Sequence, residues 1–278
     1  MRGYGTFNLP AGSWTDDSSL TLAMLDSLNR TGDIDYFDIM DSFVQWLDDG
    51  AFTPYGYAYD VGRAMRHAIN KYKHSHKPHR AGSYDERSNG NGSLMRILPA
   101  VLYCYDRALP DDAAIDIIHK VGSLTHAHIR SNIACGLYYF MAVSILDGSG
   151  TLADRLKAGL DRGFDFYEKH LSDHENLEYY DRLRDLDGFA ALPSENIYSS
   201  GYVVDTLEAA VWSLANTDSF QTALLKAVNL GEDTDTVGAV AGGLAGLYYG
   251  YDAITADWLA ALKKRDWIEK LCDAVEIQ

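Results

Sequence analysis

Apolar side chains recur along most of the chain at the spacing of an α-helix. In residues 15–30, Leu20, Met24 and Leu28 fall on one face, and residues 37–47 repeat the pattern. The same periodicity predicts helices over residues 60–73, 94–106, 111–123, 129–147, 151–169, 201–216, 219–230, 235–250 and 254–275. Convincing alternation of apolar and polar residues, which marks a half-buried strand, is missing. The chain is therefore predicted to be all-α.

Three irregular segments interrupt the helices, over residues 1–14, about 72–93 and about 171–199. No Pro- or Ser-rich linker divides the chain, and 278 residues suffice for one large domain. We therefore expect a single domain over residues 1–278. Long loops in a compact helical domain are often functional, which directs attention to the SNGNGS sequence at the end of the second segment.

Composition and charge narrow the class of protein. Apolar residues make up 47% of the chain, enough for a substantial core, and the formal net charge of −16 argues against nucleic acid as a scaffold partner. Residues 237–249 form the most apolar segment and are too short for a bilayer, which needs about 20 residues. Three scattered cysteines and an N-terminus without a signal-peptide pattern favour a cytoplasmic protein with no membrane partner.

Acidic residues gather at two predicted helix starts. One is Thr15-Asp16-Asp17, and the other is Asp233-Thr234-Asp235-Thr236 after Gly231. Each cluster alone is also explained by an ordinary capped helix start. If the two meet, their four aspartates require compensating charge, which two divalent cations would supply. Ligand sets of oxygen atoms favour Mg²⁺ or Mn²⁺ over Zn²⁺. The residues alone leave open whether the clusters meet.

Five motifs, in this order, resemble those of the ADP-ribosylglycohydrolase family, which includes dinitrogenase-reductase-activating glycohydrolase. They are WTDDSSL, SNGNGSLMRILPA, LTHAH, SGYVVDTLEAAVWSL and GEDTDTVGA, and the likeness covers nearly the whole chain. The resemblance implies an all-α orthogonal bundle with a central cleft that holds two Mg²⁺ or Mn²⁺ ions. It implies metal ligands at Thr15, Asp16, Asp17, Asp233, Asp235 and Thr236.

The same resemblance implies an ADP-ribose site around residues 88–93. Glycines would let backbone N–H groups approach the diphosphate, and a helix from Leu94 would direct its positive end at it. Asp60, in the sequence YDVG, is a further candidate acid near the cleft. The expected ligand-binding residues are Ser88, Gly90, Asn91, Gly92, Arg96 and His126.

The implied activity is metal-dependent hydrolysis of the glycosidic bond between ADP-ribose and a protein side chain such as arginine. Asp233 or Asp16 would serve as general base, and ADP-ribose or an ADP-ribosylated protein would be the partner. Family members usually begin with a Gly/Ala-rich helix that carries an acidic residue. Only 14 residues precede Thr15, so this helix is expected to be missing.

That expectation keeps a second hypothesis open, a catalytically impaired ADP-ribose-binding or crystallin-like structural member. A third hypothesis is a phosphatase of the haloacid dehalogenase type, suggested by the spacing of Asp233, Asp235 and Val237. That chemistry needs its motif at the end of a parallel strand, and the helical pattern disfavours it.

Overall fold

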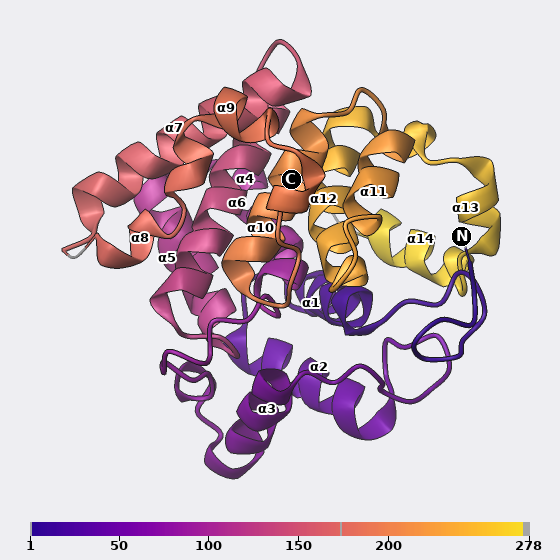
Figure 1. The fold of residues 1–278 in the computed structure, drawn as a ribbon. Coiled ribbons are helices and arrows are strands. Elements are labelled where there is room, and N and C mark those ends of the chain that lie inside the picture. The colour runs from indigo at the N-terminus through magenta and orange to yellow at the C-terminus, as the bar shows by residue number, and fades with distance from the viewer. Residues whose placement is uncertain (1, 173, 275–278) are drawn as a thin grey trace.

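The computed structural model describes residues 2–172 and 174–274 (Figure 1). Within this part, the chain forms fourteen α-helices and five short 3-10 helices, with two isolated β-bridges and no strand. The all-α prediction is therefore confirmed for the described residues. They also contain no parallel strand to carry the phosphatase motif.

The α-helices and 3-10 helices have the following bounds. The α-helices are α1 (Asp16–Thr31), α2 (Tyr36–Asp49), α3 (Arg63–Ser75), α4 (Leu98–Asp106), α5 (Asp111–Ser123), α6 (Ile129–Asp147), α7 (Leu152–His170), α8 (Glu175–Glu178), α9 (Leu186–Ala190), α10 (Val203–Ala215), α11 (Phe220–Val228), α12 (Thr234–Tyr249), α13 (Ala256–Ala261) and α14 (Arg265–Asp273). The 3-10 helices are η1 (Pro78–Arg80), η2 (Leu94–Arg96), η3 (Asp181–Arg184), η4 (Ser194–Asn196) and η5 (Tyr251–Ala253).

Three predicted segments differ from the structure. The helix expected over 94–106 is divided into η2 and α4, because Pro99 lies in the first turn of α4, where a missing N–H is tolerated. The stretch over 254–275 is divided by Lys264, which has a left-handed φ of 47°. The irregular segment over 171–199 contains α8, η3, α9 and η4, which are too short to show a helical period.

Helix α6 forms the centre of the bundle and packs against α5, α7, α10 and α12 (Figure 1). It is long and apolar enough to cross a membrane by length and composition, but 78% of that stretch is buried inside the protein. Such burial on all sides is the usual position of a core helix.

Glycines bring α12 close to its neighbours. A β-carbon at Gly238 or Gly242 would lie 3.1 Å from Val228 or 3.3 Å from Leu224, both on α11. A β-carbon at Gly243 would collide with the hydroxyl of Tyr138 on α6. The Gly-rich run therefore serves close packing, and it brings the N-terminus of α12 beside α1.

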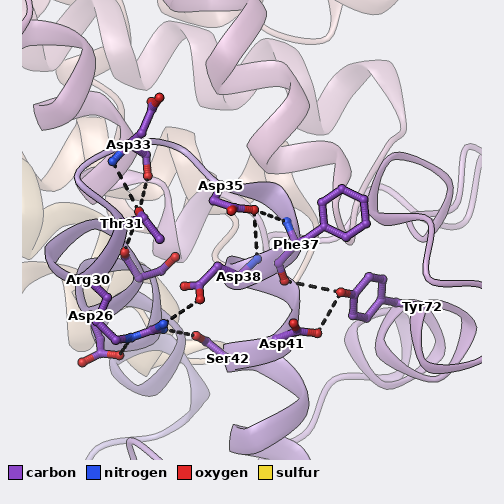
Figure 2. A network of polar contacts seen from close by, with 11 residues as sticks. Asp26, Arg30, Thr31, Asp33, Asp35, Phe37, Asp38, Asp41, Ser42 and Tyr72 are labelled. Carbon is purple, nitrogen blue, oxygen red and sulfur yellow. Dashed lines mark hydrogen bonds and ion pairs between the residues drawn. The ribbon is translucent and has the colours of Figure 1, made fainter.

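Polar contacts link the C-terminal end of α1 to α2, and α2 in turn to α3 (Figure 2). Arg30 pairs with Asp26 at 2.8 Å and with Asp38 at 2.6 Å, and Tyr72 on α3 donates a 2.8 Å hydrogen bond to Asp41 on α2. Exposed pairs of this kind contribute only about 0–1 kcal/mol each. Their role is to set the direction of α1, whose N-terminus carries the first acidic cluster.

Candidate active site

The two acidic clusters meet. Thr15 precedes α1 in an extended conformation, and its side chain makes no capping bond to that helix. Its hydroxyl instead lies 2.9 Å from Asp17 Oδ2 and 3.0 Å from Asp235 Oδ2, a residue 220 positions away. The residues alone left open whether the two acidic clusters meet. The structure shows that they do, so the starts of α1 and α12 form one site.

Residues at the start of α12 also point away from their own helix terminus. Asp233 occupies the cap position without a side-chain capping bond, and its backbone N–H donates to Ser199 O at 3.0 Å. Its carboxylate accepts a 2.8 Å hydrogen bond from Asn91 Nδ2. The Thr236 side chain lies near the carboxyl groups of both Asp233 and Asp17, and it opposes the rise in their pKa values. Helix capping therefore does not explain either cluster.

Asp60 adds a fifth carboxyl group to the site. It lies in the loop between α2 and α3 with a left-handed φ of 54°, and burial, followed by the charge of the nearby Asp235, raises the pKa of Asp60. Two carboxyl groups this close repel one another unless a proton or a cation intervenes. The sequence indicated Asp60 only as an isolated candidate, and the fold brings it to the acidic cluster.

Burial and mutual repulsion raise the pKa values of these acids. Burial, followed by the charges of Asp17, Asp60 and Asp235, raises the pKa of Asp16 to about 9. Burial and then the charge of Asp235 raise the pKa of Asp17 to about 7, and the same two causes raise the pKa of Asp60 to about 6. Such a group of acids must hold protons or bind cations.

Several observations indicate that this site fits divalent cations. The Thr15 hydroxyl has one hydrogen for two carboxylates, and Asp17 Oδ1 is buried with no hydrogen-bond partner among the described residues. All donors are hard oxygen atoms, the type preferred by Mg²⁺ and Mn²⁺. Within residues 2–172 and 174–274, no group of three or more His, Cys, Asp or Glu side chains is gathered as a ready ligand set. The carboxylates would therefore have to draw together around an ion.

Asn91 lies against the acidic cluster. Its Nδ2 donates to Asp233 and, at 2.9 Å, to Thr206 Oγ1, so both amide hydrogens are used within the protein. Its backbone N–H donates to Gly201 O at 3.2 Å and is likewise unavailable to a ligand. Asn91 therefore links the loop at residues 88–93 to Asp233, and its Oδ1 is the atom left to face a ligand.

The remaining loop residues have mixed positions. Ser88 closes a turn, since its hydroxyl donates to Asp85 Oδ2 at 2.9 Å. Gly90 forms an isolated bridge with Tyr202. A β-carbon on Gly92 would lie 2.6 Å from Cε1 of His126, so this glycine is required by the imidazole beneath the loop. The absence of a side chain at Gly92 thus leaves room for the His126 ring of the protein itself.

Arg96 differs from its predicted role. We expected it to bind ligand from the first turn of a helix, but it ends η2 and its side chain is fully buried. Its guanidinium donates to Thr125 Oγ1 at 2.8 Å and lies 4.8 Å from the centre of the Phe43 ring. Because the core encloses Arg96, it cannot contact a surface ligand directly.

Sequence reasoning assigned no role at the site to Ser199 and Gly201 just before α10, or to Thr206 in its first turn. Ser199 accepts the backbone N–H of Asp233 and donates through Oγ to Gly231 O at 3.0 Å. Gly201 and Thr206 hold the backbone and side chain of Asn91. This segment was noted only for its resemblance to the family. The available signal was its Ser-Ser-Gly sequence immediately before an apolar helix.

Comparisons with known proteins place the chain among a group of similar proteins. The family model described as ADP-ribosylglycohydrolase matches residues 1–278. An ADP-ribosylarginine hydrolase of Serratia proteamaculans (strain 568) is 31% identical over 277 residues, which cover 98% of this chain and 69% of that protein. The ADP-ribosyl-dinitrogen reductase glycohydrolase of Rhodospirillum rubrum is 32% identical over 262 residues, covering 94% of this chain and 78% of that protein.

A solved structure shows the same fold. It is described as an ADP-ribosylglycohydrolase-related protein complex and superposes with a TM-score of 0.76 at 34% sequence identity. The match covers 99% of this chain and 84% of the other.

Proposed function

The chain belongs to the ADP-ribosylglycohydrolase family of glycosidic-bond hydrolases, and from this membership we propose that it releases ADP-ribose from modified protein side chains, with arginine as the acceptor, in a reaction that depends on divalent metal ions. The observation that carries the proposal is the contact between Thr15 and Asp235, which joins the two acidic clusters into one site. The arginine acceptor is supported by the name of the relative from Serratia, an ADP-ribosylarginine hydrolase, and the protein substrate by the name of the relative from Rhodospirillum.

We propose that two Mg²⁺ or Mn²⁺ ions bind at the joined clusters. The side chains that would hold them are Thr15, Asp16, Asp17, Asp233, Asp235 and Thr236. Bound ions of this kind supply Lewis-acid polarisation of a water molecule and orient substrate hydroxyl groups. The orphaned Asp17 oxygen and the raised pKa values support this assignment.

Asp233 is the better general base of the two candidates. Hydrogen bonds from Asn91 and Thr236 oppose the rise in its pKa that burial causes. Asp16 has fewer such contacts, and its pKa is raised to about 9, so it holds a proton near neutral pH when no cation is present. A general base must be ionised to accept a proton. We assign proton abstraction to Asp233, because Asn91 places its carboxylate beside the loop at residues 88–93, and we assign ligation alone to Asp16.

ADP-ribose would bind beside the same carboxylates, at residues 88–93 and His126. Asn91 places this loop next to Asp233, so a ligand on the loop would have its ribose close to the proposed base. The alternative of a non-catalytic binding or structural protein is not favoured, because the carboxylates expected for catalysis converge.

A turnover assay tests the proposal. Purified protein would be incubated with a mono-ADP-ribosylated arginine protein, and free ADP-ribose measured by chromatography. We expect release with Mg²⁺ or Mn²⁺ and none after chelation with EDTA. Metal-dependent binding of ADP-ribose without any release would refute the hydrolase and support the binding protein.

A further inference from the structure

Arg96 is a buried cation without an acidic partner among the described residues. Its side chain is 0% exposed, and it contacts Met24 Sδ at 3.4 Å, Val121 O at 3.3 Å and Thr125 Oγ1 at 2.8 Å. Its Nε has no hydrogen-bond partner in the described part of the chain. Burial of a charge that is not paired is unfavourable, so its position requires an explanation.

The contacts of Thr125 Oγ1 determine which atom accepts a hydrogen bond from the Thr125 hydroxyl. A guanidinium can only donate, so the Thr125 oxygen accepts from Arg96. Thr125 Oγ1 also lies 2.9 Å from His126 Nδ1, and Thr125 is 0% exposed. A buried hydroxyl hydrogen needs an acceptor, and Nδ1 is the one that the described residues offer. Thr125 therefore donates to Nδ1.

This arrangement fixes the state of the His126 ring. Since Nδ1 accepts a hydrogen bond, a neutral ring must carry its hydrogen on Nε2. Burial and then the positive charge of Arg96 lower the pKa of His126 to about 3, so the ring is neutral at physiological pH. The tautomer follows from this accounting of donors and acceptors.

Nε2 lies against the loop at residues 88–93. A β-carbon would lie 3.1 Å from this atom at Gly92 and 3.7 Å at Gly90. His126 is 4% exposed, and within residues 2–172 and 174–274 no hydrogen-bond partner of Nε2 is present. The ring thus presents an unused N–H donor at the loop.

We propose that Arg96 and Thr125 are positioning residues that hold His126 as its Nε2–H tautomer, ready to donate a hydrogen bond to an oxygen atom of a nucleoside-diphosphate sugar at residues 88–93. This inference rests on the proposed function. The buried Arg96 guanidinium would then act on the ligand site indirectly, by holding Thr125 and through it the His126 ring. A neutral donor also binds an oxygen without requiring a second buried charge.

Nitrogen NMR of the full chain tests the tautomer directly. With ¹⁵N-labelled histidine, two-dimensional long-range spectra distinguish Nε2–H from Nδ1–H, and His126→Gln assigns the signal. We expect Nε2–H in the free protein and a change in the Nε2 shift when ADP-ribose is added with Mg²⁺. His119, a partly buried histidine that contacts Tyr167, is an internal control whose signal should not change.

Variants of Thr125 separate positioning from simple packing. Thr125→Val keeps the shape but removes the hydroxyl, so the Nε2–H preference should be lost and ADP-ribose affinity should fall about five- to ten-fold, as for one hydrogen bond. Thr125→Ser should restore both. Thr217→Val, which removes a hydroxyl after α10, should leave both unchanged.

Three outcomes would overturn the inference. They are an Nδ1–H ring in the free wild type, an unchanged tautomer in Thr125→Val, and failure of Thr125→Ser to restore affinity. If Thr125→Val does not fold, the wild-type tautomer and its response to ADP-ribose still decide the matter. A wild type with the Nε2–H ring that binds no ADP-ribose would refute the proposed function, and with it the role of His126.

Discussion

Thr15 Oγ1 lies 3.0 Å from Asp235 Oδ2 and 2.9 Å from Asp17 Oδ2, so one hydroxyl contacts carboxylates from the starts of both α1 and α12. A hydroxyl has a single hydrogen and cannot satisfy both oxygens fully. The contact therefore joins the clusters but leaves their negative charge uncompensated.

We expect Mg²⁺ or Mn²⁺ to raise the melting temperature of the protein. Cations bound at the proposed site would relieve its carboxylate repulsion, and a ligand at 100 times its dissociation constant adds about 2.7 kcal/mol of stability. Differential scanning fluorimetry with and without EDTA measures the shift. Asp235→Asn should reduce it, whereas Asp257→Asn, at an exposed position on α13, should not. No shift in the wild type at saturating ion would contradict the metal site.

Stability without metal should fall as the pH rises. The folded-state pKa values of Asp17 and Asp16 are raised to about 7 and about 9, whereas an unfolded aspartate titrates near 3.9. The stability contributed by the two protonated groups is fully present below the unfolded pKa and is lost as the pH rises through the folded values. In EDTA, we expect the melting temperature to decrease from about pH 6 to about pH 9.

Asp16→Asn is the control for this pH dependence. The amide resembles the protonated acid, so the variant should show a flatter profile above neutral pH. Cations compete with protons for these carboxylates, and the affinity of the wild type for Mg²⁺ should therefore increase with pH. A wild-type profile in EDTA that rises over this range would show that the acids are not buried together.

Gly92→Ala should destabilise the protein and weaken ADP-ribose binding. Its β-carbon would approach Cε1 of His126 to 2.6 Å, and overpacking of this kind costs roughly 1–3 kcal/mol. Gly246→Ala is the matched control, because nothing lies within 4 Å of its added carbon and alanine favours the helix by about 0.5–1 kcal/mol. Urea unfolding and titration calorimetry measure the two effects. Equal stability of both variants would contradict the packing of His126 beneath the loop.

The sequence was sufficient to predict most of the long helices and the acidic clusters, because both depend on local patterns. Period and capping chemistry located α1 and α12, and the resemblance joined Asp17 to Asp235. The position of Arg96 was not predictable in this way, since Pro99 divides the helix expected around it and tertiary packing turns the side chain inward. Asp60 gave only a weak signal, as its approach to the cluster depends on a left-handed residue in an irregular loop.

Asp233→Asn should abolish turnover while leaving the fold intact. The substitution removes one charge and one basic oxygen but preserves the shape of the side chain, and loss of a general base typically lowers the rate by about 10²–10⁴-fold. Release of ADP-ribose from an ADP-ribosylated arginine substrate measures the loss, and circular dichroism checks the fold. Asn91→Ala should lower kcat by a smaller factor, because it removes a hydrogen bond to Asp233 but retains the carboxylate.

Asp16→Asn provides the comparison between the two candidate bases. If Asp16 is only a metal ligand, a higher Mg²⁺ concentration should recover part of the activity of Asp16→Asn, whereas no Mg²⁺ concentration should restore the activity of Asp233→Asn. Metal rescue of Asp233→Asn, or a wild-type rate in that variant, would assign proton abstraction to another group.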